Sequence, residues 1–194
     1  MTLYLGVDPG KATAWALLRC QPQQPAMLER YGVMDFAADE TPEAWAVNGE
    51  ASEWLADRTR DFGGVTVAVE SPSRVHVRAA SGGVSPSMAS GLLFAKGIAV
   101  ALAAAAGSQG HGLALCDASM WRKRIVGRPN ASDAQVKAAL EFAVKAKRLA
   151  DLPRTNCHVR DAIGVALWAA ADWERVLRSS ASWPTASKTR SVQP

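Results

Sequence analysis

Apolar runs separated by turn residues predict five short β-strands. The expected strands cover residues 2–7, 13–18, 27–34, 65–69 and 112–116. Only the turn residues Asp8, Pro9 and Gly10 separate the first two, which is typical of a β-hairpin. The run 65–69 (VTVAV) is continuously apolar and β-branched, as expected of a strand that is buried on both faces.

Four helices are expected between and after these strands. They cover about residues 42–62, 88–106, 133–148 and 158–177. Thr41 and Ser132 suit the capping positions of the first and third helix, and Pro42 suits a first helical position. The order β-β-β-α-β-α-β-α-α combines a hairpin with β-α-β crossovers, so we predict an α/β fold in which helices cover both faces of a mixed sheet.

The composition is that of a soluble globular domain. Of 194 residues, 48% are apolar and 21% are charged, and this length suits one domain, which we place at residues 1–178. Residues 179–194 are rich in Ser, Thr and Pro and are expected to form a disordered basic tail. The most apolar run, residues 92–106, contains Lys96 and is 15 residues long, which is short for a membrane span, so no membrane is expected.

The three cysteines and the first residues of the chain indicate where the protein works. An odd number of widely spaced cysteines without a C-x-x-C pair favours a reducing compartment. The chain reaches Asp8 without a basic leader or a long apolar core, so no signal peptide is expected. We therefore expect a cytoplasmic protein.

Charge is divided unevenly along the chain. Residues 20–70 carry 3 Lys/Arg against 10 Asp/Glu, whereas residues 119–160 carry 10 Lys/Arg against 3 Asp/Glu. A polyanion would be attracted to the basic part.

Four side chains are candidates for chemistry. Asp8 and Glu70 each follow an apolar strand, and ligands of open α/β sheets bind at the carboxyl ends of strands. His158 and Asp161 are three residues apart, so they share a face near the start of the last helix. The small residues Ala162, Val165, Ala166 and Ala169 would let that helix lie tightly on the sheet.

Converging carboxylates need a positive charge. Acids about 5 Å apart repel by roughly 3 kcal/mol per pair at an effective dielectric near 20. Carboxylate oxygens with at most one imidazole suit Mg²⁺ or Mn²⁺, and a pair of such ions can activate water and stabilise the leaving oxygen of a phosphodiester. The alternative is structural: Asp8 begins a turn, Glu70 is a surface acid, and His158 with Asp161 favours the helix start.

Three segments resemble the catalytic segments of the RuvC-type Holliday junction resolvases, which have an RNase H-like fold. They are LGVDPG at 5–10, VAVES at 67–71 and HVRDAIGVALWAA at 158–170. The resemblance covers about residues 3–172. It implies that Asp8, Glu70, His158 and Asp161 are catalytic metal ligands for two Mg²⁺ or Mn²⁺ ions, and that the protein nicks two strands of a four-way junction symmetrically as a homodimer.

Two further segments fit the same resemblance. The run 91–107 looks like the family's dimer-forming helix, so small residues such as Gly97 and Ala101 are expected at a contact between two copies. The run 121–140 is similar to the segment that meets the DNA backbone. The chain departs from the family at Ser71–Val75, where many bacterial members have an aromatic wedge, and at Asp133, where a lysine is often found.

Cations near these segments are the candidate DNA contacts. The predicted contacts are Arg74, Arg78, Trp121, Arg122, Lys123, Arg124, Arg128 and Lys137. No base-reading pattern is evident, so binding is expected to depend on the structure of the DNA rather than its sequence. Trp121 could equally be a core residue, because a tryptophan beside an amphipathic helix is usually packed.

Three other functions stay open. The segment LGVDPGKATAWALL also resembles the first phosphate loop of sugar kinases and actin-like proteins, although those need two domains. A structure-specific DNA-binding module without activity would have no use for converging acids. An RNase H-like nuclease acting on RNA or on other branched DNA fits the same residues.

Overall fold

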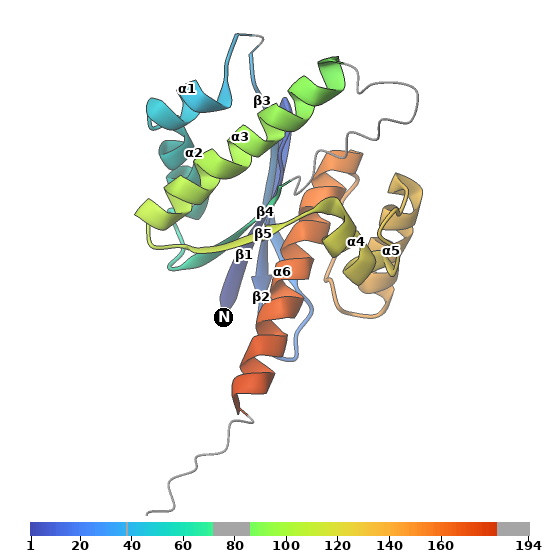
Figure 1. Ribbon diagram of the computed structural model, residues 1–194. Helices are drawn as coiled ribbons and strands as arrows, with labels where there is room; N and C mark the ends of the chain where they lie inside the picture. Colours follow the sequence, from blue (N-terminus) through green and yellow to red (C-terminus); the bar gives the residue numbers. More distant parts are fainter. Residues whose placement is uncertain (38, 72–85, 182–194) are drawn as a thin grey trace, which may run out of the picture.

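A mixed five-stranded sheet lies at the centre of the computed structural model, which describes residues 1–37, 39–71 and 86–181 (Figure 1). The strands are β1 (Thr2–Asp8), β2 (Ala12–Cys20), β3 (Met27–Asp35), β4 (Val65–Glu70) and β5 (Gly112–Cys116), in the order β3-β2-β1-β4-β5. The pairs β1–β2 and β2–β3 are antiparallel, and the pairs β1–β4 and β4–β5 are parallel. The predicted mixed sheet is confirmed.

Helices cover both faces of this sheet, as predicted (Figure 1). On one face lie α1 (Pro42–Val47), α2 (Glu50–Thr59) and α3 (Pro86–Ser108), and on the other lie α4 (Ala118–Val126), α5 (Asp133–Lys145) and α6 (Cys157–Ala181). Alternate residues of β1 enter the two cores: Leu5 packs with the α1–α3 layer, and Tyr4 with the α4–α6 layer. The site described below lies on the α4–α6 side.

Two predictions about helices were wrong, and two caps were right. Residues 42–62 do not form one helix, because Gly49 takes the left-handed conformation (φ 79°) that ends α1 and precedes α2. The helix α4 was missed, because its nine residues are too few to show a clear apolar period. The side chains of Thr41 and Ser132 accept hydrogen bonds from the backbone at the starts of α1 and α5, as expected.

Small residues bring α6 onto the sheet, as the sequence predicted. A side-chain carbon placed on Gly6 of β1 would lie 2.1 Å from the carbonyl oxygen of Ala162 and 2.6 Å from the amide nitrogen of Ala166. Such contacts cannot exist, so only glycine fits here. The close approach places the first turns of α6 beside the end of β1.

The helix α3 differs from its sequence prediction in length and in the role of two residues. Residues Ala89–Ser108 form a helix that is long and apolar enough to cross a membrane by length and composition, which the 15-residue estimate missed. Gly97 faces Pro42 of α1, where an added side-chain carbon would lie 2.7 Å from the proline, and Ala101 is buried. Ala101 therefore packs within the chain and is not at a surface that a second copy could contact, and half-buried Gly97 packs against α1.

Some predicted features lie outside the described residues. They are the loop cations Arg74 and Arg78, most of the segment that replaces the aromatic wedge, and residues 182–194 of the predicted tail.

Candidate active site

Two acids end adjacent parallel strands at the same edge of the sheet. Asp8 is the last residue of β1 and Glu70 is the last residue of β4, and the register pairs Val7 with Val69 just before them. The two carboxylates are close enough that the charge of Asp8 raises the pKa of Glu70. The strand ends therefore bring the two acids together, as the sequence predicted.

The first turns of α6 add a histidine and a third acid to this edge. The ring nitrogen Nδ1 of His158 lies 3.0 Å from Oδ2 of Asp8. Asp161 is buried one turn further on, and its charge raises the pKa of both Asp8 and Glu70. Four residues from three distant parts of the sequence thus lie at the same edge of the sheet and influence one another.

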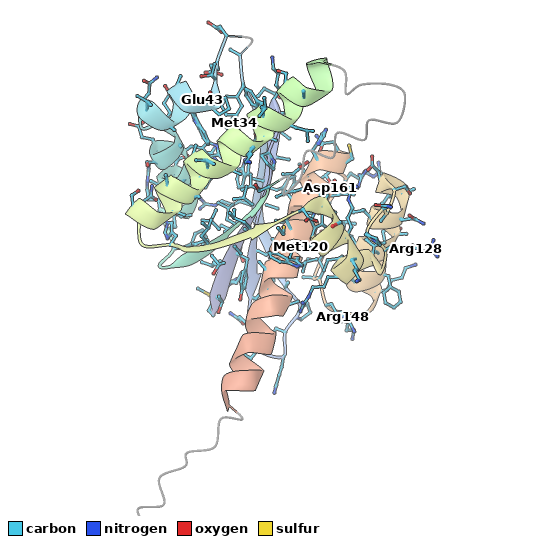
Figure 2. All side chains as sticks on the ribbon, in the orientation of Figure 1. Met34, Glu43, Met120, Arg128, Arg148 and Asp161 are labelled. Atoms are coloured by element: carbon cyan, nitrogen blue, oxygen red, sulfur yellow. The ribbon has the colours of Figure 1, made fainter. Side chains whose placement is uncertain are left out.

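Two consecutive residues of α4 hold two of the acids. The indole Nε1 of Trp121 donates a hydrogen bond of 2.7 Å to Oε2 of Glu70. The guanidinium Nη2 of Arg122 donates one of 2.7 Å to Oδ2 of Asp161, which faces α4 (Figure 2). Sequence reasoning missed both contacts; the signal available was a helix between the cap Asp117 and Gly127, which is the left-handed residue that ends α4.

Burial shifts the titration of all three acids. Loss of water raises the pKa of Asp8 to about 6, against the lowering effect of its hydrogen bond with His158. Burial and the charge of Asp8 raise the pKa of Glu70 to about 7, against the hydrogen bond from Trp121. Burial also raises the pKa of Asp161, although Arg122 opposes this shift. Clustered acids of this kind are typical of functional sites.

The donor atoms suit a hard divalent cation. Oδ1 of Asp161 is buried without a hydrogen-bond partner, which is costly unless something else binds it. The other donors at this edge are the carboxylates of Asp8 and Glu70 and the imidazole of His158, and such groups are ligands of Mg²⁺ and Mn²⁺. Within the described residues, no three acids or histidines already stand in a coordinating arrangement, since each acid is paired with a protein group.

The predicted DNA contacts fall into two groups. Lys123, Arg124, Arg128 and Lys137 are exposed on α4, on α5 and in the segment between them, and Arg128 lies on the outer side of these helices (Figure 2). Trp121 is fully buried, as the core alternative predicted, and Arg122 is turned toward Asp161.

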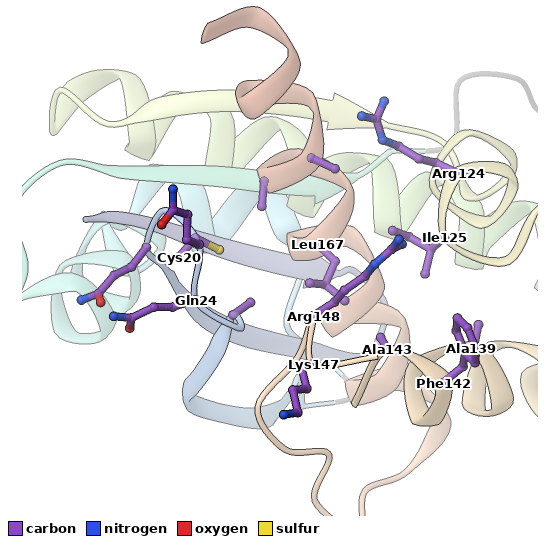
Figure 3. Close-up of a pocket in the computed structure, with 15 residues that line it drawn as sticks. Cys20, Gln24, Arg124, Ile125, Ala139, Phe142, Ala143, Lys147, Arg148 and Leu167 are labelled. Carbon is purple, nitrogen blue, oxygen red and sulfur yellow. The ribbon is translucent and has the colours of Figure 1, made fainter. Parts of the chain in front are cut away.

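Two pockets lie beside the acids rather than around them. One, of about 700 Å³, lies between the β2–β3 turn and α4–α6, where Arg124, Lys147 and Arg148 line it (Figure 3). It includes Leu167, which is six residues or about 9 Å along α6 from Asp161. The other, of about 950 Å³, has Lys137, Lys145, Arg154 and Arg160 on its walls. Neither contains the acids of the site; basic side chains line both, and the second pocket also includes Glu141 and Asp151.

The whole fold has close structural relatives. It is similar to the Thermus thermophilus RuvC structure, with a TM-score of 0.66 and 17% identity over 90% of this chain and 97% of that one. It is also similar to T. thermophilus RuvC in complex with Holliday junction substrate, with a TM-score of 0.67 and 18% identity over 91% of this chain and 97% of that one.

The chain has the RuvC fold. The yeast mitochondrial Holliday junction resolvase Ydc2 shares this RuvC fold with a TM-score of 0.58 and 10% identity, over 91% of this chain and 85% of that one. No protein-family model matches the sequence, and no curated protein matches it. The predicted RNase H-like fold is therefore confirmed at the level of structure.

Proposed function

We propose that the protein is a divalent-metal-dependent endonuclease that resolves four-way DNA junctions by paired nicks. The observation that carries this proposal is the meeting of Asp8, Glu70 and Asp161 at one edge of a sheet whose whole fold matches RuvC. A similar structure that is solved with a Holliday junction supports a branched DNA substrate.

In this proposal the three acids and His158 hold Mg²⁺ or Mn²⁺. A pair of such ions supplies an activated water and stabilises the leaving oxygen of the cleaved phosphodiester. Asp8 orients the ring of His158: a proton on Nδ1 would be donated to Oδ2 of Asp8, which leaves Nε2 as the acceptor that faces away from that contact. Trp121 fixes the Glu70 carboxylate through one oxygen.

Exposed cations supply the affinity for DNA. Lys123, Arg128 and Lys137 lie on or between α4 and α5, in the helix layer that also contains α6 and Asp161, and basic residues of both pockets belong to the same layer. Arg74 and Arg78 follow Glu70 in the sequence and are proposed contacts near the cleaved bond. Phosphate contacts of this kind position a duplex without reading its sequence.

Paired nicks require two sites, so we also propose a homodimer. One face of α3 carries Leu93, Lys96, Val100 and Ala104 toward solvent, and Leu93 and Val100 are 65% and 62% exposed. The edge strand β5 adds exposed Leu113 and Leu115 on the same side of the sheet. A second copy would bury this surface. Cys20, Cys116 and Cys157 form no disulfide bonds, which suits the reducing cytoplasm that we propose for the protein.

Cleavage assays test the proposed activity. A four-way junction should be cut in Mg²⁺ or Mn²⁺ and not in EDTA, and it should be cut faster than linear duplex, flap or RNA·DNA substrates. Asp8→Asn, Glu70→Gln and Asp161→Asn should each lower cleavage at least ~100-fold, because each removes a charged metal ligand while the basic surface is unchanged.

Junction affinity is the control for these variants. Each should bind the junction within about threefold of the wild type, since the phosphate contacts supply most of the affinity. Parallel loss of binding and cleavage would make the acids structural. Equal cleavage of RNA·DNA or flap substrates would favour the RNase H-like alternative.

A further inference from the structure

Arg122 is anchored inside the acid cluster. Besides its 2.7 Å contact with Asp161, its Nη1 donates to the carbonyl oxygen of Ala131 at 3.4 Å, and its guanidinium carbon lies 5.1 Å from the centre of the Trp121 ring. The side chain is only 23% exposed, and that of Asp161 is 10% exposed. Two of its N–H groups are therefore engaged inside the protein, and little of the side chain reaches solvent.

Its neighbours on α4 are placed differently. Lys123, the next residue, is exposed, and Arg128 beyond the end of the helix is exposed too. The basic segment therefore contains cations with two roles: those that face solvent, and one that faces the acids.

The charge of Arg122 reaches the whole cluster. It acts on Asp8 and Glu70 as well as on Asp161, and in each case it favours the ionised carboxylate. The ionised carboxylates of Asp8, Glu70 and Asp161 repel one another, so the nearby positive charge of Arg122 stabilises the folded protein before a metal ion binds.

We propose that Arg122 is a positioning residue and the internal counter-ion of the acid cluster, and not a contact to DNA. It holds Oδ2 of Asp161 and so leaves Oδ1, which is buried without a partner, for the cation. The inference rests on the proposed function only for the identity of that cation and of the DNA. Its consequence is that Arg122 and the metal ion neutralise the same acids, so their effects on stability are not additive.

Thermal melting of the wild type and Arg122→Gln, in EDTA and in saturating Mn²⁺, tests this consequence. In EDTA the variant should melt ~5 °C or more below the wild type, because a buried acid loses its partner. Mn²⁺ should raise the melting temperature of the variant more than that of the wild type and close at least half of the gap. Arg122→Lys, which keeps the charge, should melt between the two. An equal Mn²⁺ shift in both proteins would overturn the proposal.

The double variant makes the test independent of metal binding. In EDTA, Arg122→Gln should cause little further loss in a protein that already carries Asp161→Asn, because the partner charge is gone. Full additivity of the two losses would show that Arg122 stabilises something else.

Junction binding separates this role from a DNA contact, and Lys123→Gln is the matched variant on the same helix. In EDTA, Lys123→Gln should reduce the salt dependence of junction affinity by about one phosphate contact, and Arg122→Gln should leave it unchanged. A reduced salt dependence in Arg122→Gln would overturn the proposal. If the protein binds no junction at all, the proposed function fails, and the melting experiments still decide the role of Arg122.

Discussion

Each acid of the site is held through one oxygen by a residue from another element. His158 contacts Oδ2 of Asp8, Trp121 contacts Oε2 of Glu70, and Arg122 contacts Oδ2 of Asp161. Contacts of this kind orient a ligand before its metal arrives and limit the number of oxygens that it offers. Individual residues therefore decide which carboxylate oxygens are available for chemistry.

The raised pKa values predict that the metal-free protein loses stability as the pH rises. With pKa values of about 6 for Asp8 and about 7 for Glu70, the native state keeps protons that the unfolded state has released above about pH 4. The stabilisation that these bound protons give the native state is fully present below about pH 4 and is lost as the pH rises to about 7. It amounts to about 1.4 kcal/mol for each unit by which the native and unfolded pKa values differ.

Urea unfolding in EDTA at pH 5 and pH 8 measures this loss. Asp8→Asn cannot titrate and should flatten the dependence. A wild-type free energy of unfolding that is higher at pH 8 than at pH 5 would contradict the prediction.

Among the elements, α4 links the basic surface to the acids. It packs against α6, and Gly164 of α6 lies directly under the Trp121 ring, where a side-chain carbon would be 2.6 Å from the ring. The indole fills this space and reaches Glu70 at the end of β4. A shift of α4 would therefore change the contacts of both Glu70 and Asp161.

Gly164→Ala should destabilise the protein and weaken the site. The added carbon must displace a fully buried ring, which costs about 1–3 kcal/mol, and cleavage should fall further than the loss of folded protein explains. Gly107→Ala is the matched control, because nothing lies within 4 Å of that position on α3. It should stabilise the protein by up to about 1 kcal/mol and leave cleavage unchanged. Both variants are measured by urea unfolding and junction cleavage. Equal effects in the two would contradict the idea that the packing of Trp121 on Gly164 supports the site.

For the whole molecule, the two faces of the sheet present different surfaces. The α4–α6 side carries the acids and the exposed cations, and the α1–α3 side leaves an apolar stripe on α3 and β5 uncovered. In a dimer joined through this stripe, the two acid sites would be related by a two-fold axis, as a symmetric four-way junction requires.

Val100→Glu should convert a dimer into a monomer. The charge would enter the contact at one of the most exposed apolar positions of α3. Val47→Glu is the control, since Val47 is 85% exposed on α1, outside the stripe. Size-exclusion chromatography with light scattering should give a dimer for the wild type and the control. A wild-type monomer at micromolar concentration with junction bound would refute the dimer.

Local pattern determined much of the fold and part of the site. Apolar runs located all five strands, and their last residues marked Asp8 and Glu70 as acids at one sheet edge. The small residues of α6 predicted its close approach to the sheet, which the structure places at Gly6. These features depend on periodicity and side-chain size, which can be recognised from residues that are close together in the sequence.

Only the tertiary structure decided which residues pair with the acids. Trp121 lies 51 residues from Glu70 in the sequence, and Arg122 lies 39 residues from Asp161. In the sequence both belong to a basic run that is typical of a DNA-binding surface, and the direction of each side chain depends on how α4 packs against α6. The same holds for Gly97, which packs against Pro42 of α1, and for Ala101, which is buried, because the packing of α3 decides which of its small residues are covered. Packing between segments that are distant in the sequence sets the orientation of a helix, so the orientation cannot be predicted from a local sequence pattern.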